Sequence, residues 1–262
     1  MPTITTAAGP LHYREWGRGT PLLLLHANPG DSRDFEAVAL PLAQRHRVLA
    51  LDWPGYGQSS PPPAAAAMTV LHLYDALQAF MAAMQLPPVL IIGNSVGGNV
   101  AARLAAQHPD AVRGLVLVAP GGFTPHNMLT RGFCALQGSK LALSPRRFAG
   151  LYLHVKNDTT ARMLARAAGE QSEPEPQTVN RALWRSFGRP ESDLRQLARQ
   201  VKAPTLLMFG QRDLAIPARR DGAVVRACIP HARFVTLPSG HAPFAELPEA
   251  FLAQVEPFLH GI

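Results

Sequence analysis

The segment Gly93-Asn94-Ser95-Val96-Gly97-Gly98 follows a short apolar run at residues 89–93 and precedes a segment with helical spacing of apolar residues. This is the G-x-S-x-G pattern in the strand-to-helix context that it requires. The glycines remove side chains that would collide in so sharp a turn, and the turn lifts the hydroxyl of Ser95 clear of the backbone at a helix N-terminus. A glycine-rich turn with an incidental serine is the alternative, but the flanking strand and helix favour a nucleophile.

The chain on either side of this turn alternates between strand and helix patterns. Short apolar runs bounded by Gly, Pro or Asp are typical of buried strands, whereas apolar residues three or four positions apart are typical of helices. The order favours an α/β fold, with a mostly parallel central sheet and helices on both faces. Strands are expected at 11–16 (an edge hairpin), 21–26, 47–51, 89–93, 115–118, 205–209 and 233–237, and helices at 70–84, 96–105, 217–228 and 246–259.

One long interval interrupts this alternation. After the strand that ends near residue 118, the next sheet strand is expected only at residue 205, and the residues between show helical patterns. A structureless loop of that length is uncommon in a compact domain. We therefore expect a helical cap at residues 123–199, inserted into a core formed by residues 1–122 and 200–262.

Composition narrows the class of protein. The chain has 262 residues, with 47% hydrophobic and 16% charged residues, which is ordinary for a globular protein. The formal charge is +7, but the arginines are scattered and form no basic run, so we interpret them as surface residues and expect no nucleic-acid partner. The two cysteines are far apart, which fits neither a disulfide framework nor a metal site.

The ends of the chain and its apolar runs bear on location. The N-terminus has no basic patch followed by an apolar stretch, so no signal peptide is expected. The apolar runs are much shorter than the roughly 20 residues that span a bilayer. We expect a cytoplasmic protein without a membrane span; its oligomeric state is left open.

A serine hydroxyl needs a base, and the base needs an anion that fixes its tautomer. Among ten histidines, His241 lies in a loop between the last short strand and the final helix, near the carboxyl edge of the sheet, where such folds place their ligands. His26 is its main rival. Asp213 directly follows the strand at 205–209, whereas the loop after residue 118 holds no carboxylate. Ser95, Asp213 and His241 are the predicted catalytic residues.

Negative charge that develops on the substrate oxygen needs preset hydrogen-bond donors. The backbone N–H of Val96 is the first candidate. The second is the N–H of Asn28 in the loop His26-Ala27-Asn28-Pro29-Gly30, which His26 is expected to shape by hydrogen bonding. The predicted substrate-pocket residues are His26, Tyr152, Trp184 and Phe187.

These segments, together with Asp52-Trp53-Pro54-Gly55-Tyr56-Gly57-Gln58-Ser59, resemble the α/β-hydrolase superfamily over nearly the whole chain. The resemblance implies that fold and a Ser–Asp–His triad in the order seen here. The chain departs from the family pattern at Ala27, where glycine is usual. The loop from His26 to Pro29 is similar to that of haloalkane dehalogenases and epoxide hydrolases, but Ser95 stands where those enzymes use aspartate.

Three functions remain open. Hydrolysis of a carboxylic ester of a small, largely hydrophobic substrate is the leading prediction, with no cofactor and no metal expected. The second is C–C bond hydrolysis, because Gly93-Asn94-Ser95 and Ala119-Pro120-Gly121-Gly122 are similar to the meta-cleavage hydrolases. Those enzymes usually carry tryptophan after the catalytic histidine, where this chain has Ala242. The third is ligand binding with little turnover.

Overall fold

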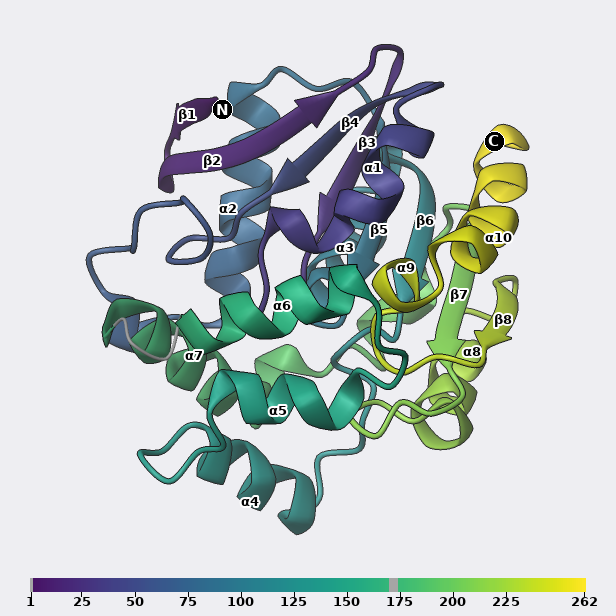
Figure 1. Cartoon of the computed structure of the whole chain (residues 1–262). Coiled ribbons are helices and arrows are strands. Elements are labelled where there is room, and N and C mark those ends of the chain that lie inside the picture. Colours follow the sequence, from purple (N-terminus) through teal and green to yellow (C-terminus); the bar gives the residue numbers. More distant parts are fainter. Residues whose placement is uncertain (1, 170–173) are drawn as a thin grey trace.

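The computed structural model describes residues 2–169 and 174–262 and contains an eight-stranded sheet in the order β1-β2-β4-β3-β5-β6-β7-β8. The strands β3 to β8 run parallel, and β2 pairs antiparallel with β4 and with the edge strand β1 (Figure 1). The predicted α/β class and mostly parallel sheet are confirmed. The strands are β1 (Thr3–Thr6), β2 (Gly9–Trp16), β3 (Thr20–Leu25), β4 (His46–Leu51), β5 (Val89–Asn94), β6 (Val112–Val118), β7 (Thr205–Gly210) and β8 (Arg233–Leu237).

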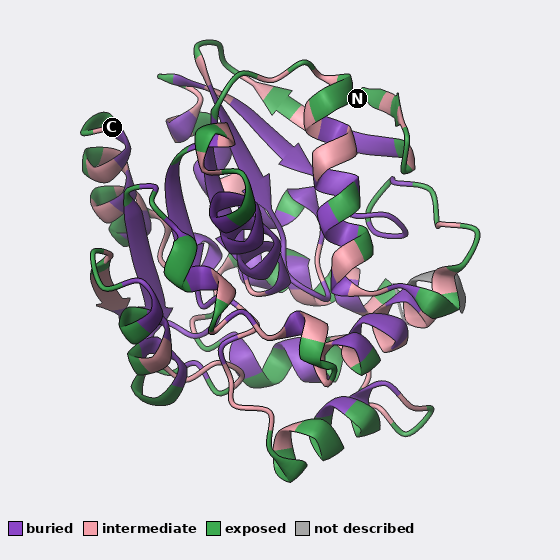
Figure 2. Ribbon diagram, turned by 180° about the vertical axis from the view of Figure 1, so that it is seen from behind, coloured by how far each residue is buried: buried purple, intermediate pink, exposed green. Residues whose placement is uncertain are grey.

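Helices cover both faces of the sheet. Successive side chains of a strand point to opposite faces, so Leu23 packs with α2 and α3, and Leu24 packs with α1 and α10. Figure 2 shows the strands buried between these layers. The helices of the core are α1 (Glu36–Leu42), α2 (Val70–Ala83), α3 (Val96–Gln107), α8 (Ala223–Cys228), α9 (Pro243–Glu246) and α10 (Pro248–His260). Shorter turns lie at Ser32–Phe35, Ala65–Ala67, Pro109–Ala111, Pro190–Ser192, Leu197–Gln200 and, as a π-helical turn, Ala218–Gly222.

The last predicted helix is shorter than expected. It begins at Pro248 and not at Glu246, which instead closes the short helix α9. Proline disfavours helical backbone in the residue before it, and Leu247 is accordingly not helical, at φ −139° and ψ 63°. The helix expected at 217–228 likewise begins with a π-helical turn before it continues as α8.

Four α-helices lie between β6 and β7 in the described part of residues 123–199, which we call the cap segment. They are α4 (Met128–Gln137), α5 (Pro145–Tyr152), α6 (Asp158–Gly169) and α7 (Pro174–Phe187). Residues 170–173 of the expected cap lie outside the described residues. Figure 1 shows these helices beyond the carboxyl ends of the parallel strands, with α4 farthest from the sheet. In the described part of the chain, no helix has the length and apolar character needed to cross a membrane.

Candidate active site

Ser95 lies in the turn between β5 and α3, with φ 55° and ψ −114°. Such backbone angles are strained for a residue with a side chain and persist only where the surroundings enforce them. The backbone N–H of Ser95 donates to the carbonyl of Val118 at 3.0 Å. A Cβ atom at Gly97 would collide with the carbonyl oxygen of Leu25. The glycine therefore lets α3 approach the end of β3 closely enough to form the turn.

A cavity of about 460 Å³ opens beside this turn. Ser95 and His241 both line it, although they are far apart in the sequence. Asn28 and Val96 also line it. Val96 is the first residue of α3, and the first turn of a helix leaves N–H groups without intrahelical acceptors. The structure therefore brings these four predicted residues to one space.

Asp213 contacts the ring of His241, at the position after β7 that the sequence indicates. The Nδ1 atom of His241 lies 2.6 Å from Oδ2 of Asp213, and both side chains are buried. The other carboxylate oxygen, Oδ1, accepts from the N–H groups of Ala215 and Ile216 at 2.8 and 3.0 Å. Because the carboxylate is fixed on both oxygens, it orients the ring with the proton on Nδ1 and leaves Nε2 as the acceptor.

A second buried carboxylate holds the histidine loop, residues 238–242. The Oε2 atom of Glu246 accepts from the backbone N–H groups of Gly240, His154 and Val155 at 2.9, 2.9 and 2.8 Å. Its Oε1 atom accepts from the N–H of Ala242 at 3.2 Å. Glu246 is only 1% exposed. One side chain thus bonds the residues on both sides of His241 and ties them to the chain after α5.

The backbone of His241 is held by two further contacts. Its N–H donates to the carbonyl of Tyr152 at 3.0 Å, and its carbonyl accepts from Nδ2 of Asn94 at 3.1 Å. The rings of Tyr152 and His241 meet edge to face, with centroids 5.1 Å apart. Residues of β5 and of α5 therefore both position His241.

Asn28 is bonded from both the core and the cap segment. Its Oδ1 atom accepts from the hydroxyl of Tyr56 at 2.5 Å and from Nδ2 of Asn180, on α7, at 3.1 Å. The side chain is buried. These bonds fix the loop whose backbone was predicted to complete the oxyanion hole.

His26 does not line the cavity, which corrects its assignment to the substrate pocket. It is fully buried, and both ring nitrogens are engaged. Nδ1 donates to the carbonyl of Ala27 at 2.7 Å, and Nε2 accepts from the N–H of Trp53 at 3.1 Å. Burial lowers the pKa of His26, which favours the neutral ring that this pattern needs. His26 shapes the loop, as its other predicted role required.

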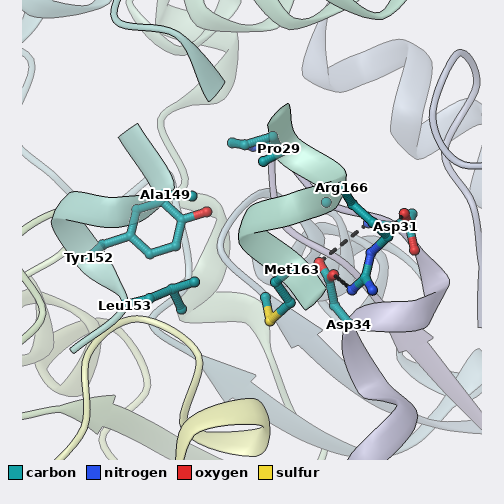
Figure 3. Close-up of a pocket in the computed structure, with 10 residues that line it drawn as sticks. Pro29, Asp31, Asp34, Ala149, Tyr152, Leu153, Met163 and Arg166 are labelled. Atoms are coloured by element: carbon teal, nitrogen blue, oxygen red, sulfur yellow. Dashed lines mark hydrogen bonds and ion pairs between the residues drawn. The ribbon is translucent and has the colours of Figure 1, made fainter. Parts of the chain in front are cut away.

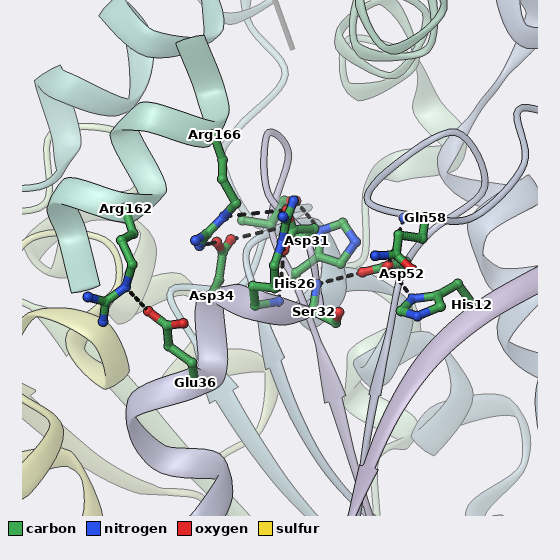
Figure 4. Close-up of polar contacts among 12 residues, drawn as sticks. His12, His26, Asp31, Ser32, Asp34, Glu36, Asp52, Gln58, Arg162 and Arg166 are labelled. Atoms are coloured by element: carbon green, nitrogen blue, oxygen red, sulfur yellow. Dashed lines mark hydrogen bonds and ion pairs between the residues drawn. The ribbon is translucent and has the colours of Figure 1, made fainter. Parts of the chain in front are cut away.

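Two buried carboxylates follow this loop and face the cap segment. Arg166 on α6 donates to Oδ1 of Asp34 at 2.7 Å and lies 3.5 Å from Oδ2 of Asp31 (Figures 3 and 4). Burial and the neighbouring charge of Asp31 raise the pKa of Asp34 to about 7, although Arg166 opposes the shift. The loop after β3 is thus bonded to α6 as well as to α7.

Both the cap segment and the core contribute apolar and polar residues to the wall of the cavity, and the phenylalanine, tyrosine and tryptophan side chains come from the cap segment. Tyr152, Trp184 and Phe187, the predicted pocket residues of the cap, lie in its wall. Trp184 packs edge to face against Phe148 and Phe133, at 5.0 and 5.6 Å between ring centroids. The remaining lining includes Leu129, Leu151, Leu214, Ala215, Ile216 and Arg220 and the polar residues Asn99, Thr124, His126, Thr130 and Ser192.

Several of these residues were missed in the sequence. Leu214 and Arg220 follow Asp213 at the carboxyl edge of the sheet, and that proximity is a signal that would have found them. Glu246, Arg166 and Asn180 gave no such signal, because their partners are backbone groups or residues in distant segments.

Comparisons with known proteins agree with this fold. Residues 20–187 match the family model described as alpha/beta hydrolase fold. A pimeloyl-[acyl-carrier protein] methyl ester esterase from Nitrosomonas europaea is 31% identical over 260 residues, covering 93% of this chain and 97% of the relative. A hydrolase structure from Pseudomonas aeruginosa is similar with a TM-score of 0.82 at 25% identity, covering 98% of this chain and 97% of that one. An esterase structure from Exiguobacterium antarcticum has a TM-score of 0.85 at 20% identity and 98% coverage of both chains, which shows the shared fold.

Proposed function

The chain belongs to the alpha/beta hydrolase fold family, and from this premise we propose that it is a serine esterase. The proposed reaction cleaves a carboxylic ester of a small, largely hydrophobic substrate through an acyl-enzyme on Ser95. One observation carries the proposal: His241 is bonded through Nδ1 to the buried Asp213 and shares a cavity with Ser95. Esterase activity in the relative from Nitrosomonas europaea supports the same chemistry.

The first half of the reaction forms the acyl-enzyme. Oγ of Ser95 attacks the ester carbonyl while Nε2 of His241 takes its proton, and Asp213 stabilises the imidazolium that results. The oxyanion accepts hydrogen bonds from the N–H groups of Asn28 and Val96. His241 then gives the proton to the departing alkoxide, so the alcohol leaves and Ser95 holds the acyl group.

The second half releases the acid. Water enters, His241 removes one of its protons, and the hydroxide attacks the acyl carbonyl. The same two N–H groups stabilise the second oxyanion. Its collapse breaks the bond to Oγ, which recovers the proton from His241. The reaction as proposed uses neither a metal nor a cofactor.

The apolar residues of the cavity favour a substrate with a hydrophobic acyl or alkyl group. Phe148, Tyr152, Trp184 and Phe187 of the cap segment present apolar surface opposite Ser95. C–C hydrolysis has less support. Its substrate carries a carboxylate, and Arg220, an arginine of the cavity lining, already pairs with Asp221 at 2.8 Å.

Turnover of p-nitrophenyl esters from acetate to decanoate, beside a dienol dioxo-acid, tests the proposal. We expect ester hydrolysis that is lost in Ser95→Ala and kept in Ser60→Ala, since Ser60 is exposed and outside the cavity. Cleavage of the dioxo-acid with no ester turnover would instead support C–C hydrolysis. Tight binding of an ester without turnover by the native chain would support the ligand-binding alternative.

A further inference from the structure

The exposed apolar side chains of this protein are concentrated around the mouth of its cavity. Leu40 apart, every large apolar side chain that is exposed in the described residues lies on the cap segment or at Leu214. Met128, Leu129 and Leu141 are 89%, 84% and 81% exposed. We call the exposed apolar and basic residues of α4, α5 and the loop between them the cap rim: Met128, Leu129, Arg131, Phe133, Leu136, Lys140, Leu141, Leu143, Arg146, Arg147 and Leu151.

The cap rim continues into the candidate active site. Leu129, Phe133 and Leu151 are exposed and also line the cavity, and Leu214 does the same from the core. Leu129, Phe133 and Leu136 recur at the spacing of one helix face. Cys134 and Gln137, also on α4, are buried. Four apolar side chains are therefore exposed to solvent and also line the cavity that contains Ser95.

The charge of this region has one sign. Residues 111–157 contain no Asp or Glu, although arginine and lysine are present. Arg131, Lys140, Arg146 and Arg147 are all exposed, and within the described part of the chain none of them forms an ion pair. Across the cavity mouth, Leu214 is accompanied by exposed Arg212 and Arg219. The arginines are scattered along the sequence, but the absence of carboxylates from this stretch makes the cap rim basic.

We propose that the cap rim docks on an anionic lipid surface. Separate protruding apolar side chains interleaved with Lys and Arg match the boundary between acyl chains and anionic headgroups. Figures 1 and 2 show α4 projecting from the rest of the molecule with exposed residues along it. Such a projection can enter a lipid layer.

The position of the cavity also favours a lipid surface as the binding partner. An acyl chain held in a lipid layer would pass along Leu129 and Phe133 into the cavity without crossing water. The proposal goes beyond ester hydrolysis, because binding to the surface requires no turnover. The two can therefore fail separately.

Sedimentation with vesicles tests the docking. We expect the native chain to sediment with vesicles of phosphatidylglycerol and phosphatidylcholine, much less with phosphatidylcholine alone, and less as salt is added. The double variant Met128→Ser/Leu141→Ser should bind about tenfold more weakly or worse. The double variant Arg131→Glu/Lys140→Glu should lose a similar factor.

The controls separate docking from folding and from turnover. None of these four residues lines the cavity, so hydrolysis of a dissolved short ester should be unchanged in both double variants. Leu40→Ser and Arg45→Glu alter an exposed apolar residue and an exposed arginine away from the cap rim, and binding should survive them.

Three results would overturn the proposal. One is equal binding to both kinds of vesicle. Another is binding that neither double variant weakens. The third is a native chain that does not sediment with either kind of vesicle, including one that instead binds a purified acidic carrier protein or a second copy of itself through the same residues.

Discussion

The nucleophile turn and the histidine loop end at the same cavity, but different parts of the chain hold them there. Ser95 is fixed from within the sheet, by the carbonyl of Val118 and by the close approach of Gly97 to the end of β3. Asp213 and Asn94 of the core hold His241, and the cap segment adds the carbonyl of Tyr152. Glu246 ties the histidine loop to the chain after α5. The position of the nucleophile is thus part of the core, whereas the position of the base also depends on how α5 is seated.

The loop after β3 resembles the histidine loop in this respect. Asn28 is bonded to α7, and Asp34 is bonded to α6. We infer that a change in the position of the cap segment displaces His241 and the loop after β3 more than it displaces Ser95. Three substitutions test this difference.

The largest effect is expected on the side of the nucleophile. In Gly97→Ala, the new methyl group meets backbone atoms of Leu25 and His26, which have little freedom to move. The free energy of unfolding should fall by about 3 kcal/mol, at the upper end of the usual cost of overpacking. Urea denaturation measures the change.

Gly132→Ala is the matched control, because a Cβ atom there meets nothing within 4 Å on the exposed surface of α4. It should leave stability unchanged or raise it by about 0.5 kcal/mol, since alanine favours helix. Equal stabilities for the two variants would contradict the account of the turn.

A smaller and more specific effect is expected on the side of the base. Glu246→Gln keeps the shape of the side chain but replaces one acceptor oxygen with an N–H₂ group. At least one of the four backbone N–H groups then faces another donor, at a cost of about 1–3 kcal/mol. We expect the lost hydrogen bond to displace His241. The kcat should then drop about 10- to 100-fold with little change in KM.

Glu249→Gln changes the same residue type three positions later on the exposed surface, and its kcat should match that of the native chain. Steady-state kinetics on a short ester provide both values. If Glu246→Gln lowers stability but leaves turnover normal, the carboxylate holds the fold and not the base.

The smallest effect concerns the contact between α6 and the loop after β3. Because the pKa of Asp34 is raised to about 7, the folded chain keeps a proton that the unfolded chain has released at the same pH. Stability should therefore fall as the pH rises from about 4 to about 7. Asp34→Asn should flatten this dependence, because the amide does not titrate.

Thermal melts across that range test the prediction, with Asp110→Asn as an exposed control. If both variants keep the native slope, Asp34 is not the group that titrates.

Local patterns were enough to predict the core and most of the candidate site. The runs at β3, β5 and β7 are buried on both faces, so each is apolar throughout and ends at a marked turn. Ser95, Asp213 and His241 directly follow strands or lie in the loop after one, and the carboxyl ends of parallel strands meet at one edge. Their convergence follows from the order of the elements.

What the sequence could not reveal depends on contacts between distant segments. His26 looked like a pocket residue because it follows β3, but its ring is turned toward Trp53. Glu246 was placed inside a helix by its apolar neighbours, and only the folded chain shows four N–H groups around its carboxylate. The cap rim required knowledge of which leucines the cap leaves exposed.

The central claim is that Ser95 is a nucleophile activated by His241. Labelling with a fluorophosphonate, followed by intact mass and peptide mapping, tests it most directly, because the probe reports the attacking atom without assuming a substrate. We predict one adduct on Ser95, absent in Ser95→Ala and formed at least about 100-fold more slowly in His241→Ala. An unlabelled Ser95 in a chain that hydrolyses esters, or labelling that His241→Ala leaves unchanged, would contradict the account.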